Sequence, residues 1–315
     1  MKTALIFGVS GQDGSLMSKL LINKNIKVIG VTRDKKQNFK NHILLNTYKK
    51  INIISISKYN YKNIYRIIKD CKPNYIYNFS GESSVNSSFT NFKETYYSII
   101  DVTEIILKSI NSIDKKIKFF NTSSSECYGN YGKTIIENSP FFPVSPYGIA
   151  KCEAFEITKY YRNHKNIFSS SGIMFNHESP LRNKRFVIKK IFNGIYTIKK
   201  NPNFKVNLGN IDIKRDWGWA PDFMRAAFLI LQDKIPEDYV ICSNNYLSLR
   251  TFIKKSFNYH NLNYLNHVII NKNLFRHIDI VSSKGSNKKI MGKLKWKPIN
   301  KINDIIYKIS NNKYD

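Results

Sequence analysis

The sequence predicts an α/β fold built on a doubly wound, mostly parallel sheet, followed by a smaller C-terminal α/β domain. Three features predict it: apolar runs alternate with amphipathic stretches in the first half, a glycine-rich turn follows the first apolar run, and the pattern changes after about residue 176. Alternating strands and helices are typical of βαβ units, whose strands lie parallel in one sheet. The 315 residues suffice for one large domain or two coupled domains.

The first half of the chain supplies the strands of this sheet and the helices between them. Short apolar runs bounded by polar turns predict strands, and longer amphipathic stretches predict helices. The strands are expected at residues 3–9, 26–32, 51–56, 75–79, 117–123 and 168–175, and the helices near residues 15–23, 60–69, 87–112 and 146–164.

A glycine-rich turn marks the first connection from strand to helix. Gly8, Gly11 and Gly14 follow directly on the first strand and open a helix, with Gln12 and Asp13 between them. Glycines here permit a tight turn and let backbone N–H groups approach a pyrophosphate at the helix N-terminus. The spacing alone is common, but its place after an N-terminal strand predicts a Rossmann-type dinucleotide site.

The end of the second strand bears on which dinucleotide binds. An acidic residue at this place would bind the ribose hydroxyls of NAD, whereas an arginine nearby accommodates the 2′-phosphate of NADP. Thr32 occupies the acidic position and Arg33 follows it, which favours NADP over NAD. Asp34 keeps NAD open as the alternative, because its carboxylate could bind the ribose instead.

The second half of the chain has longer basic helices joined by irregular connections. We interpret residues 1–176 as the Rossmann domain that binds NADP, and residues 177–315 as a domain for the substrate. Residues from about 210 to 240 are expected to cross back to the first domain. Helices are expected in this half at residues 187–200, 221–233 and 249–259.

Composition narrows the class of protein. The net charge is +29, but lysine is scattered over the whole length, and asparagine, isoleucine and tyrosine are abundant too. We interpret the charge as a compositional bias that also favours anionic substrates. Nucleic-acid binding is the lesser alternative, because no zinc-finger, RNP-type or basic-zipper pattern accompanies the charge.

The location of the protein follows from what its sequence lacks. No apolar run reaches the length of about 18 residues that a membrane span needs, and the first residues do not resemble a secretory signal. The four cysteines lie far apart, without metal-type or Cys-x-x-Cys spacing. We therefore expect a cytoplasmic protein with no metal site and no membrane partner.

The stretch from residue 124 to residue 151 carries groups for acid–base chemistry. Ser124 and Glu126 end an apolar strand at the sheet edge where open α/β sheets bind ligands. Tyr147 and Lys151 lie one turn apart on the next helix, where an ammonium near the phenol would lower the tyrosine pKa. Such a phenol can take a proton from a sugar hydroxyl while hydride leaves the same carbon. Glu126 adds a second acid/base, which simple alcohol oxidation does not need.

At these residues the sequence resembles the extended short-chain dehydrogenase/reductase superfamily and, within it, the GDP-mannose 4,6-dehydratase family. The resemblance extends over nearly the whole chain, and its most specific blocks are Asn176-His-Glu-Ser-Pro and Lys214-Arg-Asp-Trp-Gly. The stretches that carry it are residues 8–14, 124–129, 145–151, 176–180 and 208–218, with a weaker match over residues 276–298.

The resemblance implies an internal redox cycle on GDP-mannose. Tyr147, assisted by Lys151 and Ser124, would deprotonate the sugar O4 while the C4 hydride passes to NADP⁺. Glu126 would remove the C5 proton, which the 4-keto group has acidified, and help to expel the C6 hydroxyl as water. Hydride would then return to C6, which gives GDP-4-keto-6-deoxymannose.

The same matching implies which residues bind the two nucleotides. Arginine suits a diphosphate because its planar fork donates paired hydrogen bonds. His177 is expected to be structural or to contact the cofactor, rather than to act as a base. The implied cofactor contacts are Gly8, Gly11, Gln12, Asp13, Gly14, Arg33, Tyr147, Lys151 and His177. The residues implied for the GDP group are Asn176, Lys190, Arg215 and Arg276.

Some residues depart from the family pattern. Glu82 and Ser84 stand where glutamine and histidine are expected, and Ser55 replaces an acidic residue expected at the adenine. These changes keep a GDP-manno-heptose dehydratase open as an alternative, and a non-catalytic NADP-binding protein as the alternative from another class. The family also implies a homodimer through the helices near residues 87–112 and 146–164, or a homotetramer.

Overall fold

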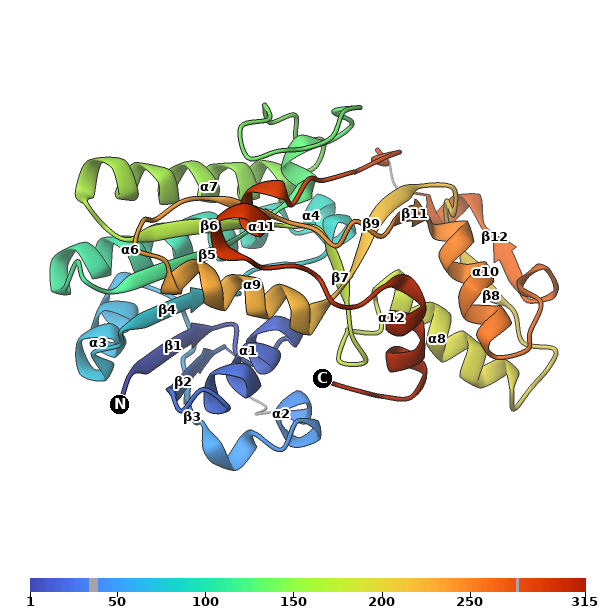
Figure 1. The fold of residues 1–315 in the computed structure, drawn as a ribbon, viewed down its shortest axis with the longest axis horizontal. Coiled ribbons are helices and arrows are strands. Elements are labelled where there is room, and N and C mark those ends of the chain that lie inside the picture. The colour runs from blue at the N-terminus through green and yellow to red at the C-terminus, as the bar shows by residue number, and fades with distance from the viewer. Residues whose placement is uncertain (34–38, 276–277) are drawn as a thin grey trace.

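The computed structural model describes residues 1–33, 39–275 and 278–315 and confirms the predicted α/β architecture (Figure 1). Within these residues, seven strands form one parallel sheet in the order β10-β6-β5-β4-β1-β2-β3. The order reverses between β1 and β4, so the sheet is doubly wound. Its strands are β1 (Thr3–Phe7), β2 (Lys27–Thr32), β3 (Asn52–Ser55), β4 (Tyr75–Asn78), β5 (Lys118–Ser124), β6 (Ser169–Met174) and β10 (Tyr239–Ile241).

Helices cover both faces of this sheet, as the near-continuous apolar strands require. On β1, Ala4 and Ile6 join the apolar cluster formed with α1, α9 and α11. Leu5 and Phe7 point to the opposite face and join the cluster formed with α3 and α6, beside which α7 packs. The covering helices are α1 (Gln12–Ile22), α3 (Tyr61–Cys71), α6 (Val102–Ile113), α7 (Pro146–Lys165), α9 (Ala220–Gln232) and α11 (Lys288–Leu294).

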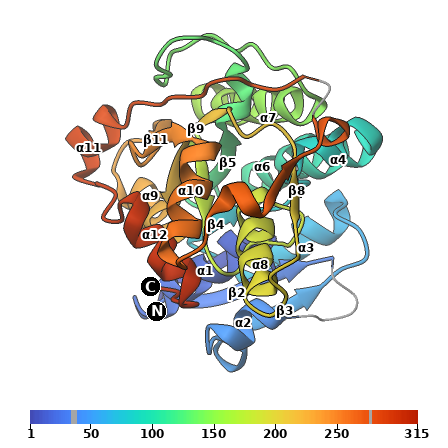
Figure 2. The same ribbon diagram turned by 90° about the vertical axis from the view of Figure 1, so that its right-hand side faces the viewer.

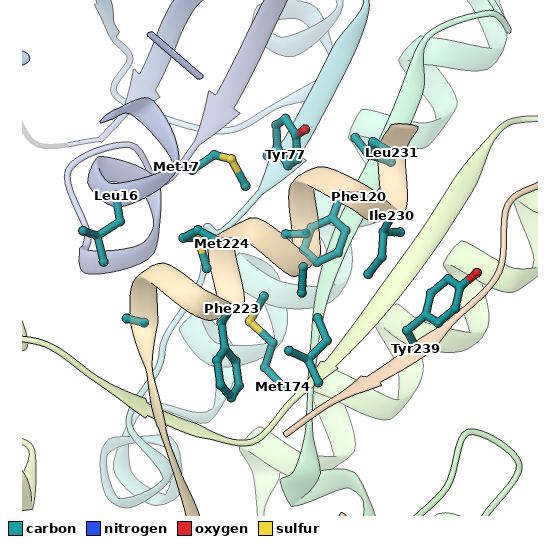
Figure 3. Close-up of a cluster of buried hydrophobic side chains, with 14 of the residues drawn as sticks. Leu16, Met17, Tyr77, Phe120, Met174, Phe223, Met224, Ile230, Leu231 and Tyr239 are labelled. Atoms are coloured by element: carbon teal, nitrogen blue, oxygen red, sulfur yellow. The ribbon is translucent and has the colours of Figure 1, made fainter. Parts of the chain in front are cut away.

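Helix α9 shows that the chain returns to the large sheet after a long excursion. Figure 3 shows its side chains Phe223, Met224, Ile230 and Leu231 among residues of α1 and of the central strands. The next strand, β10, then pairs with β6 at the edge of the sheet. Each large apolar side chain buried in this way contributes about 1.5–3 kcal/mol. The returning segment is therefore an integral part of the sheet's core.

A smaller lobe lies at one end of the large sheet and has its own apolar cluster (Figures 1 and 2). Trp217 and Trp219 are fully buried in it and pack against its other apolar side chains. Its helices are α8 (Val187–Ile198), α10 (Leu249–Tyr259) and α12 (Ile302–Ser310). The small strands are β7 (Asn176–Glu178), β8 (Val206–Leu208), β9 (Lys214–Trp219), β11 (Tyr246–Ser248) and β12 (Val268–Ile270).

The helix expected over residues 87–112 is divided in the structure. Asn91 leaves the helical region at φ −115° and ψ 50°, and the π-helical segment η2 (Tyr97–Asp101) follows further on. Hydroxyls of Thr95 and Thr103 bond to carbonyls one turn earlier, a contact that bends helices. The pieces before α6 are α4 (Val85–Thr90) and α5 (Phe92–Tyr96).

The remaining elements are short connections. No helix in the described part of the chain is both long and apolar enough to cross a membrane. These connecting elements are α2 (Lys40–Leu44), η1 (Tyr48–Lys50), η3 (Ser125–Tyr128), η4 (Tyr264–Asn266) and η5 (Lys272–Leu274).

Candidate active site

A cleft of about 380 Å³ lies between the carboxyl edge of the large sheet and the smaller lobe. Segments that follow β4, β5 and β6 form one wall, and residues of α8 and of the turn after β8 form the other. This is the edge at which open α/β sheets bind ligands. Of the residues implied by the sequence, the cleft is lined by Asp13, Ser124, Glu126, Tyr147, Lys151, Asn176, His177 and Lys190.

Helix α7 places Tyr147 and Lys151 in this cleft. The Ser145 side chain caps the helix by accepting from Gly148 N at 3.0 Å, and Pro146 occupies the first turn. Lys151 Nζ donates to Thr122 O at 2.7 Å and lies 5.7 Å from the centre of the Tyr147 ring. Burial lowers the pKa of Lys151 to about 8. A backbone carbonyl of β5 thus fixes the position of the Lys151 ammonium near the Tyr147 ring.

The predicted effect of Lys151 on the Tyr147 phenol is wrong for this structure. Burial raises the pKa of Tyr147 above its ordinary value; the Ser124 hydroxyl opposes this by a hydrogen bond, and the Glu126 charge adds to it. The Lys151 ammonium is bonded to the Thr122 carbonyl, 5.7 Å from the centre of the tyrosine ring, and does not offset the effect of burial on the phenol pKa. Tyr147 therefore carries its proton at neutral pH in this arrangement.

Glu126 reaches the cleft from η3, directly after β5. Its N–H donates to Ser124 Oγ at 3.2 Å, so one serine contacts both the glutamate backbone and the tyrosine phenol. Gly148 lets the start of α7 press against this turn, because a Cβ there would lie 2.8 Å from Glu126 O. The carboxyl and the phenol therefore share the cleft, and each acid/base group lies at the capped start of its element.

The glycine-rich turn fits a dinucleotide. Gly8 has φ +76°, and a Cβ there would lie 2.5 Å from Phe79 O; at Gly14 it would lie 2.4 Å from Gly8 O. These two glycines make the turn possible. At Gly11, the N-cap of α1, a Cβ would meet only Gly8 O, at 3.4 Å. The space before the helix N-terminus is thus open to a pyrophosphate.

His177 links the glycine-rich turn to the segment that follows β6 through its two ring nitrogens. Its Nε2 lies 3.1 Å from both carboxylate oxygens of Asp13, and its Nδ1 lies 2.7 Å from Phe175 O. Burial would raise the pKa of Asp13, but His177 and Arg182 reverse the effect and lower it to about 2. For His177, burial would lower the pKa, but Asp13 raises it above the ordinary value. The contact supports a structural role for His177.

Replacing Asp13 with asparagine should destabilise the protein by about 2 kcal/mol, because it removes this buried ion pair. The lowered Asp13 pKa stabilises the fold above about pH 3.8, and that stability is lost as the pH falls towards 2. The raised His177 pKa stabilises the fold below about pH 6.5, and that stability is lost as the pH rises through the folded-state value.

The difference between wild type and Asp13→Asn should therefore be largest between about pH 4 and 6.5. Urea denaturation across this range measures it. The exposed Asp70→Asn on α3 is the control, for which no pH-dependent difference is expected. A difference that grows steadily above pH 7 would contradict the ion-pair account.

Arg33 lies at the end of β2, where the 2′-phosphate of NADP is expected. Its Nη1 donates to the Glu94 carboxylate at 2.5 Å, and the guanidinium lies 5.3 Å from the centre of the Tyr59 ring. Thr32 is buried, and its hydroxyl lies 3.3 Å from Ser10 Oγ. Asp34, the residue that kept NAD open, lies outside the described residues.

One of the residues implied for GDP, Arg215, is not in the cleft wall. The Arg215 side chain is 3% exposed and donates to Lys214 O at 3.0 Å, within the buried strand β9. Arg276 lies outside the described residues, so its role stays a prediction, as does that of Arg215. Sequence reasoning missed Arg182 and Arg185, which do line the cleft. The sequence feature that could have identified these two arginines is the basic run directly after the Asn-His-Glu-Ser-Pro block.

Comparison with known proteins identifies the family. The model of the family described as GDP-mannose 4,6 dehydratase matches residues 5–309. The chain belongs to this family. It is 35% identical over 311 residues to GDP-mannose 4,6 dehydratase 1 of Arabidopsis thaliana, covering 94% of this chain and 85% of that protein. It is 34% identical to the Cricetulus griseus GDP-mannose 4,6 dehydratase, covering 94% and 87%. The predicted resemblance is thus confirmed.

A bacterial relative agrees with this assignment, and solved structures share the fold. The GDP-mannose 4,6-dehydratase of Yersinia enterocolitica is 35% identical, over 81% of this chain and 71% of that protein. The fold is similar to DesIV, a dTDP-glucose 4,6-dehydratase from Streptomyces venezuelae, with a TM-score of 0.86, 16% identity and coverage of 98% and 96%. A UDP-glucuronic acid 4-epimerase from Bacillus cereus gives a TM-score of 0.83 at 18% identity, with coverage of 99% and 98%.

Proposed function

We propose that this protein converts GDP-mannose to GDP-4-keto-6-deoxymannose, with loss of water and without net oxidation. The observation that carries the proposal is that Glu126 shares one cleft with Ser124, Tyr147 and Lys151. An alcohol dehydrogenase needs only the phenol and its partners, whereas a dehydratase also needs a group that moves the C5 proton. Membership of the family supplies the substrate.

The first half-reaction is oxidation at C4 of the mannosyl group. NADP⁺, when bound, supplies the hydride acceptor for C4 and the hydride donor for C6. Tyr147 takes the O4 proton, and Ser124, already bonded to the phenol, shares the hydrogen bond to that oxygen. Because burial raises the pKa of the Tyr147 phenol, proton removal needs added positive charge in the cleft. Lys151, fixed at Thr122 O, holds its ammonium 5.7 Å from the centre of the Tyr147 ring.

The second half-reaction is elimination of water across C5 and C6. The 4-keto group acidifies the C5 proton, which the Glu126 carboxylate takes. The same carboxyl then gives a proton to the departing C6 hydroxyl, because hydroxide is a poor leaving group. One group can do both only if it lies along the C5–C6 edge of the sugar. Its place on η3, two residues beyond the serine that contacts Tyr147, supports this.

The GDP group is proposed to lie towards the smaller lobe. Asn176 and Lys190 line that side of the cleft, together with Arg182 and Arg185. These cations offset the charge of a diphosphate, and the arginines can donate to it in pairs. The net charge of the whole chain would further favour encounter with an anionic substrate.

We propose NADP as the cofactor, on the basis of Arg33 and the absence of an acidic residue at Thr32. Replacing Arg33 with alanine should weaken NADPH binding about tenfold and leave NADH binding unchanged, because only NADPH carries a 2′-phosphate. Glu94→Gln should strengthen NADPH binding by up to about fivefold, because Glu94 competes for Arg33. Fluorescence titration of both reduced cofactors measures this. Tighter binding of NADH by the wild type would overturn the choice.

We propose a cytoplasmic homodimer as the working state. Apolar side chains such as Phe92 of α5 and Ile149 and Tyr160 of α7 are exposed, and α5 packs against α7. These elements lie in the region that the family pattern implies for subunit contact. Light scattering at micromolar concentration tests the assembly, and a monomer would contradict it; a tetramer would extend it.

Incubation of the purified protein with GDP-mannose and, separately, with GDP-manno-heptose tests the substrate. Mass analysis should show a GDP-sugar lighter by one water from GDP-mannose, with no net NADPH produced. A heptose-only product would favour the alternative substrate, which the Glu82 and Ser84 replacements keep open. No product from either sugar, with NADP bound, would favour the non-catalytic alternative.

A further inference from the structure

A carboxylate that the mechanism does not use lies in the wall of the same cleft. Glu82 follows β4, and its Oε1 accepts from the backbone N–H groups of Ser83 at 2.7 Å and Ser84 at 2.8 Å. Arg185 Nη2 donates to the same oxygen at 2.7 Å and to the Ser83 hydroxyl at 3.1 Å. Three donors therefore fix the direction of this carboxylate.

The second carboxylate oxygen of Glu82 is left available to a ligand. Within residues 1–33, 39–275 and 278–315, the donors that reach Glu82 all bond to Oε1. The side chain is 18% exposed and lines the cleft. An ionised carboxylate only accepts hydrogen bonds, and an oxygen that loses its contact with water when a ligand fills the cleft needs a donor from that ligand.

The Glu82–Arg185 pair joins the two walls of the cleft. The turn with Glu82 leads into α4, whose Ser88 Oγ accepts from Tyr147 N at 3.2 Å, so this turn lies on the catalytic side. Arg185 precedes α8, the helix that carries Lys190 on the opposite wall. A nucleotide sugar with its reactive carbons at Tyr147 and its diphosphate near the cations would have its glycosyl ring between them.

We propose that Glu82 is a specificity-determining residue, whose Oε2 accepts a hydrogen bond from the C2 or C3 hydroxyl of the glycosyl group. The inference rests on the proposed function, because C4, C5 and C6 are then engaged by the catalytic residues and only C2 and C3 remain. Arg185 positions the carboxylate and offsets its repulsion of the diphosphate. The site thus selects neutral glycosyl groups with a free hydroxyl here and disfavours sugars that carry a carboxylate.

Calorimetric titration tests this in the Tyr147→Phe background, where bound sugar is not consumed. The ligands are GDP-mannose, its 2-deoxy and 3-deoxy analogues, and GDP alone. With Glu82 present, loss of the hydroxyl that it binds should weaken affinity about tenfold to a hundredfold. With Glu82→Ala added, loss of the same hydroxyl should have no further effect, and the affinity for GDP alone should not weaken.

Two results would overturn the proposal. One is that both deoxy analogues lose the same affinity with and without Glu82. The other is that Glu82→Ala weakens GDP as much as GDP-mannose, since the residue would then act on the nucleotide or on the fold. The exposed Glu104→Ala on α6 is the control, for which the analogue losses should match those of the parent.

Turnover by the wild type separates this inference from the proposed function. Water loss from GDP-mannose without coupling between Glu82 and either hydroxyl refutes only the role of Glu82. Coupling in the affinities without turnover refutes the dehydratase function and upholds the sugar contact. A chain that does not bind GDP-mannose refutes both.

Discussion

Replacement of Tyr147 with phenylalanine is expected to lower kcat for GDP-mannose by about a hundredfold to ten-thousandfold. The substitution removes only the hydroxyl that is proposed to take the O4 proton, and a positioned acid/base group contributes a factor of that size. The ring keeps its contact with Lys151 and its place on α7, so KM should change little. Steady-state assay of the dehydrated product, by mass, measures both constants.

The control for this substitution lies on the same helix. Tyr160 is exposed on α7, and Tyr160→Phe removes a hydroxyl of the same kind far from the cleft lining. Its kcat should equal that of the wild type. If Tyr147→Phe retained more than about a tenth of the wild-type kcat, the phenol could not be the group that takes the O4 proton.

Replacement of Glu126 with glutamine is expected to separate the two half-reactions. The amide has nearly the shape of the carboxyl but cannot take the C5 proton, so C4 oxidation continues and water loss stops. Reduced cofactor should then accumulate to about one equivalent per site on addition of GDP-mannose, while the dehydrated product falls by at least about a hundredfold. Absorbance of the reduced nicotinamide and the mass of the sugar product are measured together.

The result that distinguishes a block of the second half-reaction is accumulation of reduced cofactor without dehydrated sugar product. Tyr147→Phe should show neither, because it blocks the earlier step, and Glu156→Gln on the exposed face of α7 should behave as wild type. Full dehydratase activity in Glu126→Gln would refute the assignment of the C5 proton to this residue. Loss of product with no reduced cofactor would place Glu126 in the first half-reaction instead.

The sequence predicts the large sheet well because its signals are local. Strands β1 to β6 begin or end within two residues of the expected positions, since each is a single apolar run between polar turns. Ser145 and Pro146 likewise fix the start of α7 through their own capping geometry. The catalytic groups follow from these elements, because a residue at the end of a known strand or in the first turn of a known helix has a predictable place.

The remaining features depend on contacts between distant parts of the chain. Pairing of β7 with β9 joins Asn176 to Trp217 and buries Arg215, and no local pattern encodes that partner. The same holds for the Arg33–Glu94 pair, in which the carboxylate competes with a 2′-phosphate for the arginine. The Tyr147 pKa also depends on burial by several elements, so helical spacing to a lysine gives its direction wrongly.

The most direct test of the central claim is to follow the hydrogen at C4. GDP-mannose deuterated at C4 should yield a dehydrated product with deuterium at C6, because the hydride leaves and returns within one bound complex. Nuclear magnetic resonance of the product locates the label. Deuterium at C6 with a proton from solvent at C5 would support the internal redox cycle. A product with deuterium still at C4, or with C6 labelled from solvent, would contradict it.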